Sequence, residues 1–312
     1  MIIKNIIKKH PRIMYYIKGV KRKAFIRKMS SMTQKELMDY DAELFENRLG
    51  TKLDWNNLRT YSEKMQWEKL FDKNPLKVTL TDKYRVRKWV SDLIGEEYLI
   101  PLIGVWDTVD EINFDSLPNQ YVLKTNCASG DVIIIKDKTK VRKKQIAEYK
   151  AKLNYFRNMK FGYNTLELHY NEIEPKIVCE QLIECADTDL QDYKFLCFDG
   201  VPVYCWVDTG RYHHHKRNVY NLDWELQDWN QYRYGQSENP IPKPANFDKM
   251  VEIAKKLSAG FSHVRVDLYN NEGIIYFGEM TFTNSSGFEK INPPEADLML
   301  GNYWNIDTSI DK

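Results

Sequence analysis

The chain has 312 residues, 43% hydrophobic and 13% aromatic, a composition that supports two or three packed subdomains and excludes a disordered protein. Its formal net charge of +2 is unevenly distributed, because residues 1–35 contain eleven Lys or Arg and no acid, which leaves 35 of the 46 basic residues against all 44 acidic residues in the rest. This acidic body argues against a nucleic-acid partner, and the lack of an apolar run of about eighteen residues argues against a membrane span.

The N-terminal segment is both basic and apolar. Residues 1–29 place large apolar side chains among Lys and Arg residues, including Ile2, Ile3, Ile6, Ile7, Ile13, Met14, Ile17 and Phe25, and Lys interrupts the apolar patches too often for a signal peptide. This pattern predicts an interfacial helix, broken at Pro11, that contacts an anionic membrane surface. A frayed, solvated tail is the alternative. We therefore expect a cytoplasmic protein, with peripheral attachment to the inner face of the membrane as a further hypothesis.

Helical and strand patterns alternate through the first half of the chain. Thr81-Asp82-Lys83 is an N-cap candidate for a helix that ends at Gly95. Lys124 lies on a predicted strand just before the small-residue loop 127–130, and such a strand, loop and strand can fold over a triphosphate. An ordinary hairpin is the alternative. Further helices are predicted at 33–48, 61–71 and 141–156, and strands at 98–105, 121–126, 131–136 and 176–183.

The second half opens with a hairpin, 192–198 and 201–207, about Asp199-Gly200. The three consecutive histidines at 213–215 cannot all chelate one ion, because neighbouring side chains diverge, so a polar loop or substrate lip is predicted. Asn246 caps a helix that ends at Gly260. The five cysteines are odd in number and lack CxxC spacing, which is typical of buried free thiols in a reducing cytoplasm.

Residues 261–287 concentrate the charged side chains that suggest chemistry. Period-two alternation defines a strand, and Asn271-Glu272-Gly273 then reads as a three-residue hairpin loop. Pairing Asn270 with Ile274 places Arg265 opposite Glu279. One face of the hairpin then carries five polar residues, His263, Arg265, Asp267, Glu279 and Thr281.

Two interpretations of this face remain open. It can be a solvated face with a cross-strand Arg265–Glu279 pair, because buried charges are costly without partners. Alternatively, Asp267 and Glu279 supply oxygen ligands to a divalent cation, while Arg265 steadies a phosphate or an oxyanion.

Several motifs, in this order and spacing, resemble those of the ATP-grasp superfamily: Asp82-Lys83, Leu123-Lys124 with Ser129-Gly130, Glu180-Gln181-Leu182-Ile183, Arg265-Val266-Asp267 and Gly278-Glu279. Longer strings resemble the TupA-like branch, which is named for teichuronopeptide biosynthesis and found in surface-polysaccharide loci. These strings are DKYRVRKWV, YVLKTNCASGDVIIIKDK, DYKFLCFDGVP, KLSAGFSHVRVDLYN and YFGEMTFTNSSGF. The resemblance covers roughly residues 55–301.

The resemblance implies an α+β, ATP-grasp fold in which two α+β subdomains grip ATP, preceded by a small N-terminal region of helices and strands. The corresponding divisions are a basic tail at 1–35, an N-terminal region at 36–110, a first subdomain at 111–178, a second with the catalytic hairpin at 179–301, and a C-terminal tail at 302–312.

The resemblance also implies an ATP-dependent ligase that converts a carboxylate to an acyl phosphate, from which an amine displaces phosphate. By motif position, the implied ATP-binding residues are Lys83, Lys124, Ser129, Gly130, Glu180, Gln181, Leu182, Ile183 and Asp187. The implied Mg²⁺ ligands are Asp267 and Glu279, and the catalytic candidates are Arg265, Lys194 and Arg211. Thr281 stands where the superfamily usually has Asn, so that either Asn284 compensates or a second metal binds weakly.

The family setting suggests a uronic acid or acidic glycan as acyl donor and an amino acid or amino alcohol as nucleophile, in surface polysaccharide or capsule biosynthesis. One alternative is a glycosyltransferase that uses Asp187 and Asp189 as a DxD motif. Another is a membrane-surface adaptor without catalysis, which leaves the charged hairpin face unexplained. The sequence carries no signal for an oligomeric state.

Overall fold

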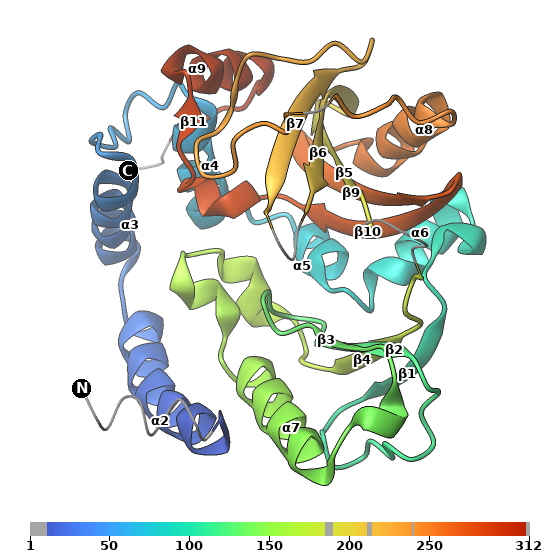
Figure 1. The fold of residues 1–312 in the computed structure, drawn as a ribbon. Coiled ribbons are helices and arrows are strands. Elements are labelled where there is room, and N and C mark those ends of the chain that lie inside the picture. The colour runs from blue at the N-terminus through green and yellow to red at the C-terminus, as the bar shows by residue number, and fades with distance from the viewer. Residues whose placement is uncertain (1–10, 185–189, 211–213, 239, 310–312) are drawn as a thin grey trace. The chain divides into compact units, whose positions relative to one another are not determined.

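The computed structural model describes residues 11–184, 190–210, 214–238 and 240–309 (Figure 1). The chain divides into two compact units, each assembled from three segments. Unit 1 comprises Met1–Lys35, Val78–Val86 and Ile100–Leu182, and unit 2 comprises Glu36–Lys77, Arg87–Leu99 and Ile183–Lys312. Both units combine helices with antiparallel sheet, which confirms the predicted α+β class.

Unit 1 contains a four-stranded antiparallel sheet in the order β1-β4-β2-β3. Its strands are β1 (Leu102–Trp106), β2 (Tyr121–Thr125), β3 (Ile133–Ile135) and β4 (Ile177–Glu180). Helix α7 (Lys143–Arg157) buries Leu153 in the same apolar cluster as Leu123 and Ile177 of the sheet. Helix α2 (Pro11–Ser30) lies against α7 (Figure 1). The prediction of a frayed tail is therefore wrong for residues 11–30.

Two predicted boundaries in the N-terminal half need correction. The expected strand 98–105 begins only at Leu102, because the 3₁₀ turn Glu96–Tyr98 and Pro101 precede it, and proline has no N–H for a ladder. Thr81 is not an N-cap but the last residue of α5 (Leu76–Thr81). Instead, Asp82 Oδ1 accepts from the amides of Tyr84, at 2.8 Å, and Arg85, at 3.1 Å, in the turn before α6 (Val86–Ile94).

Unit 2 is built on a five-stranded antiparallel sheet in the order β10-β9-β5-β6-β7. Its strands are β5 (Asp192–Phe198), β6 (Val201–Thr209), β7 (Lys216–Asn221), β9 (His263–Asn271) and β10 (Ile274–Thr281), and a second, two-stranded sheet pairs β8 (Asn230–Gln231) with β11 (Ile291–Asn292). The helices, besides α6, are α3 (Gln34–Leu49), α4 (Tyr61–Phe71), α8 (Phe247–Ser258) and α9 (Pro294–Tyr303). The 3₁₀ turn η5 (Asn284–Gly287) follows β10.

The two faces of this sheet differ in what covers them. Helix α8 packs on one face, where its Phe247 stacks on Phe195 with ring centroids 5.7 Å apart (Figure 1). On the other face, alternate residues of β5, β6 and β7 form an apolar cluster with α4 and α9, in which Tyr61 and Trp304 are buried. The same face continues along the strands into charged residues. Strand alternation thus places one apolar half and one charged half on a single face.

The β9–β10 hairpin differs in register from the prediction. Its loop has two residues, Glu272 at φ 52° and Gly273 at φ 90°, the left-handed pair that a tight hairpin favours. A bulge at Gly278 then shifts the ladder by one residue, so that Glu279 pairs with Asp267, and Thr281 with Arg265. The predicted polar face survives, because the shorter loop and the bulge each shift the pairing by one residue, and a combined shift of two residues keeps the same face.

The remaining details are mixed. The β5–β6 hairpin about Asp199-Gly200 is confirmed. Asn246 precedes α8, but its side chain makes no cap; it donates to Gly273 O at 2.9 Å and accepts from Asn270 at 2.6 Å. The cysteines at 127, 179, 197 and 205 are buried and free, as predicted. Cys185 lies outside the described residues.

Candidate active site

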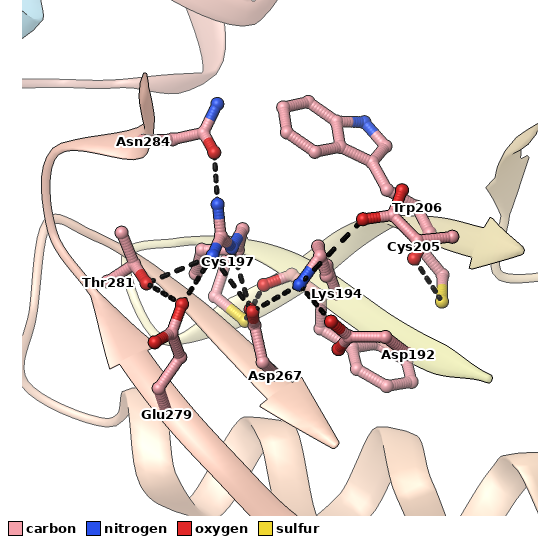
Figure 2. Close-up of polar contacts among 12 residues, drawn as sticks. Asp192, Lys194, Cys197, Cys205, Trp206, Asp267, Glu279, Thr281 and Asn284 are labelled. Atoms are coloured by element: carbon pink, nitrogen blue, oxygen red, sulfur yellow. Dashed lines mark hydrogen bonds and ion pairs between the residues drawn. The ribbon is translucent and has the colours of Figure 1, made fainter. Parts of the chain in front are cut away.

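The charged half of the unit 2 sheet is a row of ion pairs across neighbouring strands (Figure 2). At its centre, Lys194 Nζ of β5 lies 2.5 Å from Asp192 Oδ2 and 2.6 Å from Asp267 Oδ2 of β9. Lys194 and Asp267 are paired residues in the β5–β9 ladder, which brings their side chains together on one face. The predicted site residues Lys194 and Asp267 are therefore in direct contact.

Arg265 spreads its guanidinium over the residues of the hairpin. Nε lies 2.6 Å from Asp267 Oδ1 and Nη2 lies 2.8 Å from Asp267 Oδ2, a bidentate pair. Nη2 also donates to Glu279 Oε1 at 2.9 Å and to Thr281 Oγ1 at 3.1 Å, while Nη1 donates to Asn284 Oδ1. Arg265 thus connects four residues, each of which was predicted as a site residue or as part of this face: Asp267, Glu279, Thr281 and Asn284.

The far end of the row contains two charged residues that were not predicted from the sequence. Asp208 of β6 forms a bidentate pair with Arg217 of β7, at 2.6 and 2.8 Å, and lies 4.0 Å from Lys194 Nζ. Arg217 also donates to Gln231 and lies over the ring of Trp206. Asp208 could have been predicted from the Asp199-Gly200 hairpin, because that hairpin pairs Asp192 with Asp208 and so extends the charged face by one strand.

Histidines contribute to this face in different ways. His215 Nε2 lies 3.3 Å from Asp208 Oδ2, so the predicted polar loop does reach the charged row at this residue. His213 lies outside the described residues. His263 contacts Cys197 O through Nδ1 and Tyr61 Oη through Nε2, both at 2.9 Å, and burial lowers its pKa to about 3. His263 is therefore neutral and belongs to the core.

Burial rules out the interpretation of a solvated face. The side chains of Asp267, Lys194 and Arg265 are only 3%, 4% and 8% exposed. The side chain of Glu279 is 42% exposed and lies at the edge of the row. Charges buried to this degree persist only when partners neutralise them, and here each has at least one. The predicted Arg265–Glu279 contact exists, but within a largely buried network.

The ionisation states follow from this pairing. Burial alone would lower the pKa of Lys194, yet Asp192 and Asp267 raise it above its usual value. Burial likewise opposes the charge on Arg265, and Asp267 is the main cause of a raised pKa. Burial would raise the pKa of Asp208, but hydrogen bonds from Arg217 and His215 hold it well below its usual range. The row therefore keeps its cations charged.

The oxygen donors in this row are of the kind that Mg²⁺ prefers. Asp267 and Glu279 are opposed on neighbouring strands, and the Thr281 hydroxyl and the Asn284 amide oxygen lie beside them around Arg265. Among the described residues, no group of three or more His, Cys, Asp or Glu could hold a metal. Two carboxylates nevertheless suffice for Mg²⁺, which keeps waters and takes further oxygens from substrate phosphates.

Unit 1 brings together the other predicted site residues. Lys83 Nζ donates to Ala128 O at 2.6 Å, so this cation is held against the 127–130 loop, in which Gly130 has φ 84° and both Ser129 and Gly130 are exposed. Lys124 Nζ lies 2.5 Å from Glu180 Oε2, at the end of β4. Of the predicted backbone ligands after Glu180, the amide of Gln181 is engaged within the protein, because it donates to Pro101 O at 2.9 Å.

The remaining predicted residues lie partly inside and partly outside the described chain. Leu182 and Ile183 follow β4 and are partly buried. Asp187 and Arg211 lie outside the described residues, as does Asp189 of the alternative glycosyltransferase motif.

None of the helices among the described residues is long and apolar enough to cross a membrane.

The TupA-like ATP-grasp model matches residues 63–305. The chain belongs to this family. The match confirms the resemblance carried by the motifs from Lys83 to Glu279 and, with it, the ATP-grasp form of the α+β fold. No curated protein matches the chain in sequence.

The solved structures that the TupA-like chain matches include several ligases. A D-alanine–D-alanine ligase from Bacillus anthracis, complexed with ATP, has 17% identity and a TM-score of 0.36 over 65% of this chain and 53% of its own. The enzyme of the same name from Helicobacter pylori has 12% identity and a TM-score of 0.40 over 73% of this chain and 59% of its own. D-cycloserine synthetase DcsG has 14% identity and a TM-score of 0.39 over 85% and 93%.

The TupA-like chain thus spans between half and two thirds of the length of these D-alanine–D-alanine ligases. The TM-scores are too low to carry an argument. The family assignment rests instead on the match over residues 63–305.

Proposed function

We propose that the protein is an ATP-dependent carboxylate–amine ligase. A carboxylate oxygen attacks the γ-phosphorus of ATP, the bond to ADP breaks, and an acyl phosphate forms. The amine nitrogen then attacks the acyl carbon, phosphate leaves, and the amine loses a proton to give an amide. The observation that carries this proposal is the buried row of Arg265, Asp267 and Lys194, with Glu279 at its exposed edge.

This row suits a reaction in which negative charge spreads over oxygens. Phosphoryl transfer needs cationic groups at the transferred phosphate and little covalent help from the protein. The bidentate pair with Asp267 holds the planar guanidinium of Arg265 in place, so that its orientation is set before the substrate binds. Lys194 is a second buried cation in the same row, and Arg211 is proposed as an additional ligand for phosphate or substrate carboxylate.

Asp267 and Glu279 would hold Mg²⁺, with Asn284 supplying an amide oxygen where Thr281 replaces the usual Asn. A metal ion held by these residues would supply positive charge to offset the negative charge of the phosphates. Thr281 meanwhile donates to Glu279 Oε1 at 3.1 Å and orients that carboxylate toward Arg265.

The ATP-binding residues are proposed on unit 1 and the segment that follows it. Lys83 and Lys124 contact phosphates, and Ser129 and Gly130 cover them through backbone amides. Glu180 accepts from the adenine amino group, the backbone of Gln181, Leu182 and Ile183 completes the adenine site, and Asp187 binds ribose. The Lys83–Ala128 and Lys124–Glu180 contacts support this grouping, because they hold each lysine beside its proposed neighbour.

The finer parts of the proposal concern substrate and location. The acyl donor is a uronic acid or an acidic glycan of a surface polysaccharide, and the nucleophile is an amino acid or amino alcohol. The enzyme works in the cytoplasm and attaches to the anionic inner face of the membrane through residues 1–29. The excess of eleven basic residues before Glu36 supports this attachment.

Mg-ATP is expected to raise the melting temperature of the protein, because a ligand that binds only the native state adds RT ln(1 + [L]/Kd), about 2.7 kcal/mol at a hundredfold excess over Kd. Differential scanning fluorimetry with millimolar Mg-ATP, Mg-ADP and a nucleotide sugar measures this. A shift with the nucleotide sugar and none with ATP or ADP would refute ATP binding.

A further inference from the structure

Helix α2 packs against the rest of unit 1 along one side. Tyr15 contacts the ring of Tyr155 on α7 with centroids 5.4 Å apart, and Lys18 lies over both rings. One turn later, Arg22 donates to Lys160 O at 2.6 Å, to Asn164 Oδ1 at 2.7 Å and to Met159 O. Because these residues recur every three or four positions, they form one face of the helix. This packed face fixes the rotation of α2 about its axis.

The opposite side of α2 exposes apolar side chains. Ile13, Tyr16 and Val20 are 52%, 74% and 56% exposed, at the same helical spacing, and the sequence continues this side with the exposed Lys23 and Arg27. Single exposed apolar residues are common on protein surfaces. Three that lie next to one another on one helix face, with cations beside them, form a contiguous apolar patch with a basic border. We call Ile13, Tyr16, Val20, Lys23 and Arg27 the outer face of α2.

Charge decides which partner fits this surface. Helix α2 has seven Lys or Arg and no acidic residue, so the partner must be anionic. A nucleic acid would satisfy the cations but would leave Ile13 and Val20 against phosphates and sugars, where aliphatic side chains gain little. A bilayer surface accepts both, since aliphatic and aromatic side chains enter the acyl boundary while Lys and Arg remain among headgroup phosphates.

We propose that the outer face of α2 binds an anionic lipid surface, with the helix lying parallel to it. The inference rests on the membrane attachment proposed for residues 1–29 and names the side chains that carry it. Helix α2 lies beside α7, which it contacts through its packed face (Figure 1). The proposal therefore makes α2 a docking element of defined orientation, whose outer face meets lipid.

Vesicle flotation with the full-length protein tests the proposal. Vesicles of phosphatidylcholine with 30% phosphatidylglycerol are compared with vesicles of phosphatidylcholine alone. The wild type is expected to float only with the anionic vesicles and less in high salt. The triple variant Ile13→Ser, Tyr16→Ser, Val20→Ser is expected to bind about tenfold more weakly. Reversing two charges, Lys23→Glu and Arg27→Glu, is expected to weaken binding by at least about 25-fold, at roughly fivefold for each cation lost.

Matched controls lie on unit 2. Tyr232 and Val201 are 75% and 52% exposed, and Lys88 is an exposed cation, so Tyr232→Ser with Val201→Ser, and Lys88→Glu, change equivalent side chains elsewhere. These controls should bind vesicles like the wild type. Every variant should keep the melting-temperature shift with Mg-ATP, which separates this proposal from the ligase proposal.

Three outcomes would overturn the inference. If the wild type floats but the outer-face variants float equally well, attachment runs through another part of residues 1–29. If the wild type does not float with anionic vesicles, both the outer face and the proposed membrane attachment fail. If a duplex oligonucleotide binds at the same salt concentration and the serine variant does not weaken it, the basic helix serves a nucleic acid instead.

Discussion

The variant Glu279→Gln is expected to fold normally and to lose turnover by about 100-fold or more. The side chain of Glu279 is 42% exposed, so removing its charge should change the free energy of unfolding by only about 0–1 kcal/mol. As a proposed metal ligand it acts on charge that develops during phosphoryl transfer, where single groups are worth about 10²–10³ in rate. Urea unfolding and ADP release measure the two effects separately.

Asp267→Asn should behave differently, because its surroundings are different. Asp267 lies between Lys194 and Arg265 and is 3% exposed, so the amide leaves two buried cations with one fewer charge to balance them. Loss of one partner from a buried pair costs about 3–5 kcal/mol, and this variant should therefore lose both stability and turnover. The contrast makes Glu279→Gln the cleaner probe of the metal site.

Glu272→Gln is the matched control, because Glu272 lies exposed in the loop of the same hairpin. It should change neither stability nor ADP release. Wild-type turnover in Glu279→Gln would place the catalytic centre on other strands.

The variant Arg265→Lys is expected to lower turnover by about 100-fold while the affinity for Mg-ATP changes little. One ammonium cannot make the bidentate pair with Asp267 and also reach Glu279 and Asn284, as the guanidinium does. The proposed role of Arg265 at the acyl phosphate is expressed in the transition state, so the loss should appear in kcat rather than in nucleotide binding. Single-turnover ADP release and a fluorescent nucleotide titration separate the two.

Arg217→Lys controls for the structural part of that loss. Arg217 makes an equally short bidentate pair, with Asp208, and is similarly buried, but it lies three strands away in the sheet. Both substitutions should lower stability to a similar degree. A fall in turnover of the same size in Arg217→Lys would mean that Arg265 acts only by holding the sheet together.

The polar face of the hairpin could be predicted from sequence because strand alternation is a local property. His263, Arg265 and Asp267 share a face whatever the register, since each lies two residues from the next. The register itself depended on two features, a loop one residue shorter than predicted and a bulge at Gly278, and each of them shifts the pairing by one residue in the same direction. The combined shift of two residues keeps Glu279 on the same face as Arg265, which is why the contact between them was predicted correctly although their pairing was not.

Burial could not be read from the same pattern. A row of charges on one face is equally compatible with solvent or with a neutralised interior, and the difference lies in partners supplied by other strands. Lys194 comes from a hairpin about seventy residues earlier in the chain, and Asp208 and Arg217 extend the row farther. The ordered motifs predicted the family, whereas the pairing of these charges required the long-range order of the sheet.

ADP formation from ATP, measured with purified protein offered panels of uronic acids and amines, tests the ligase proposal most directly. We predict multiple-turnover release of ADP and phosphate only when ATP, Mg²⁺, a carboxylate and an amine are all present, with one amide formed per ADP, and loss of this release in Glu279→Gln but not in Glu272→Gln. Release of a nucleoside diphosphate from a nucleotide sugar, with no ADP formed from ATP, would contradict the account.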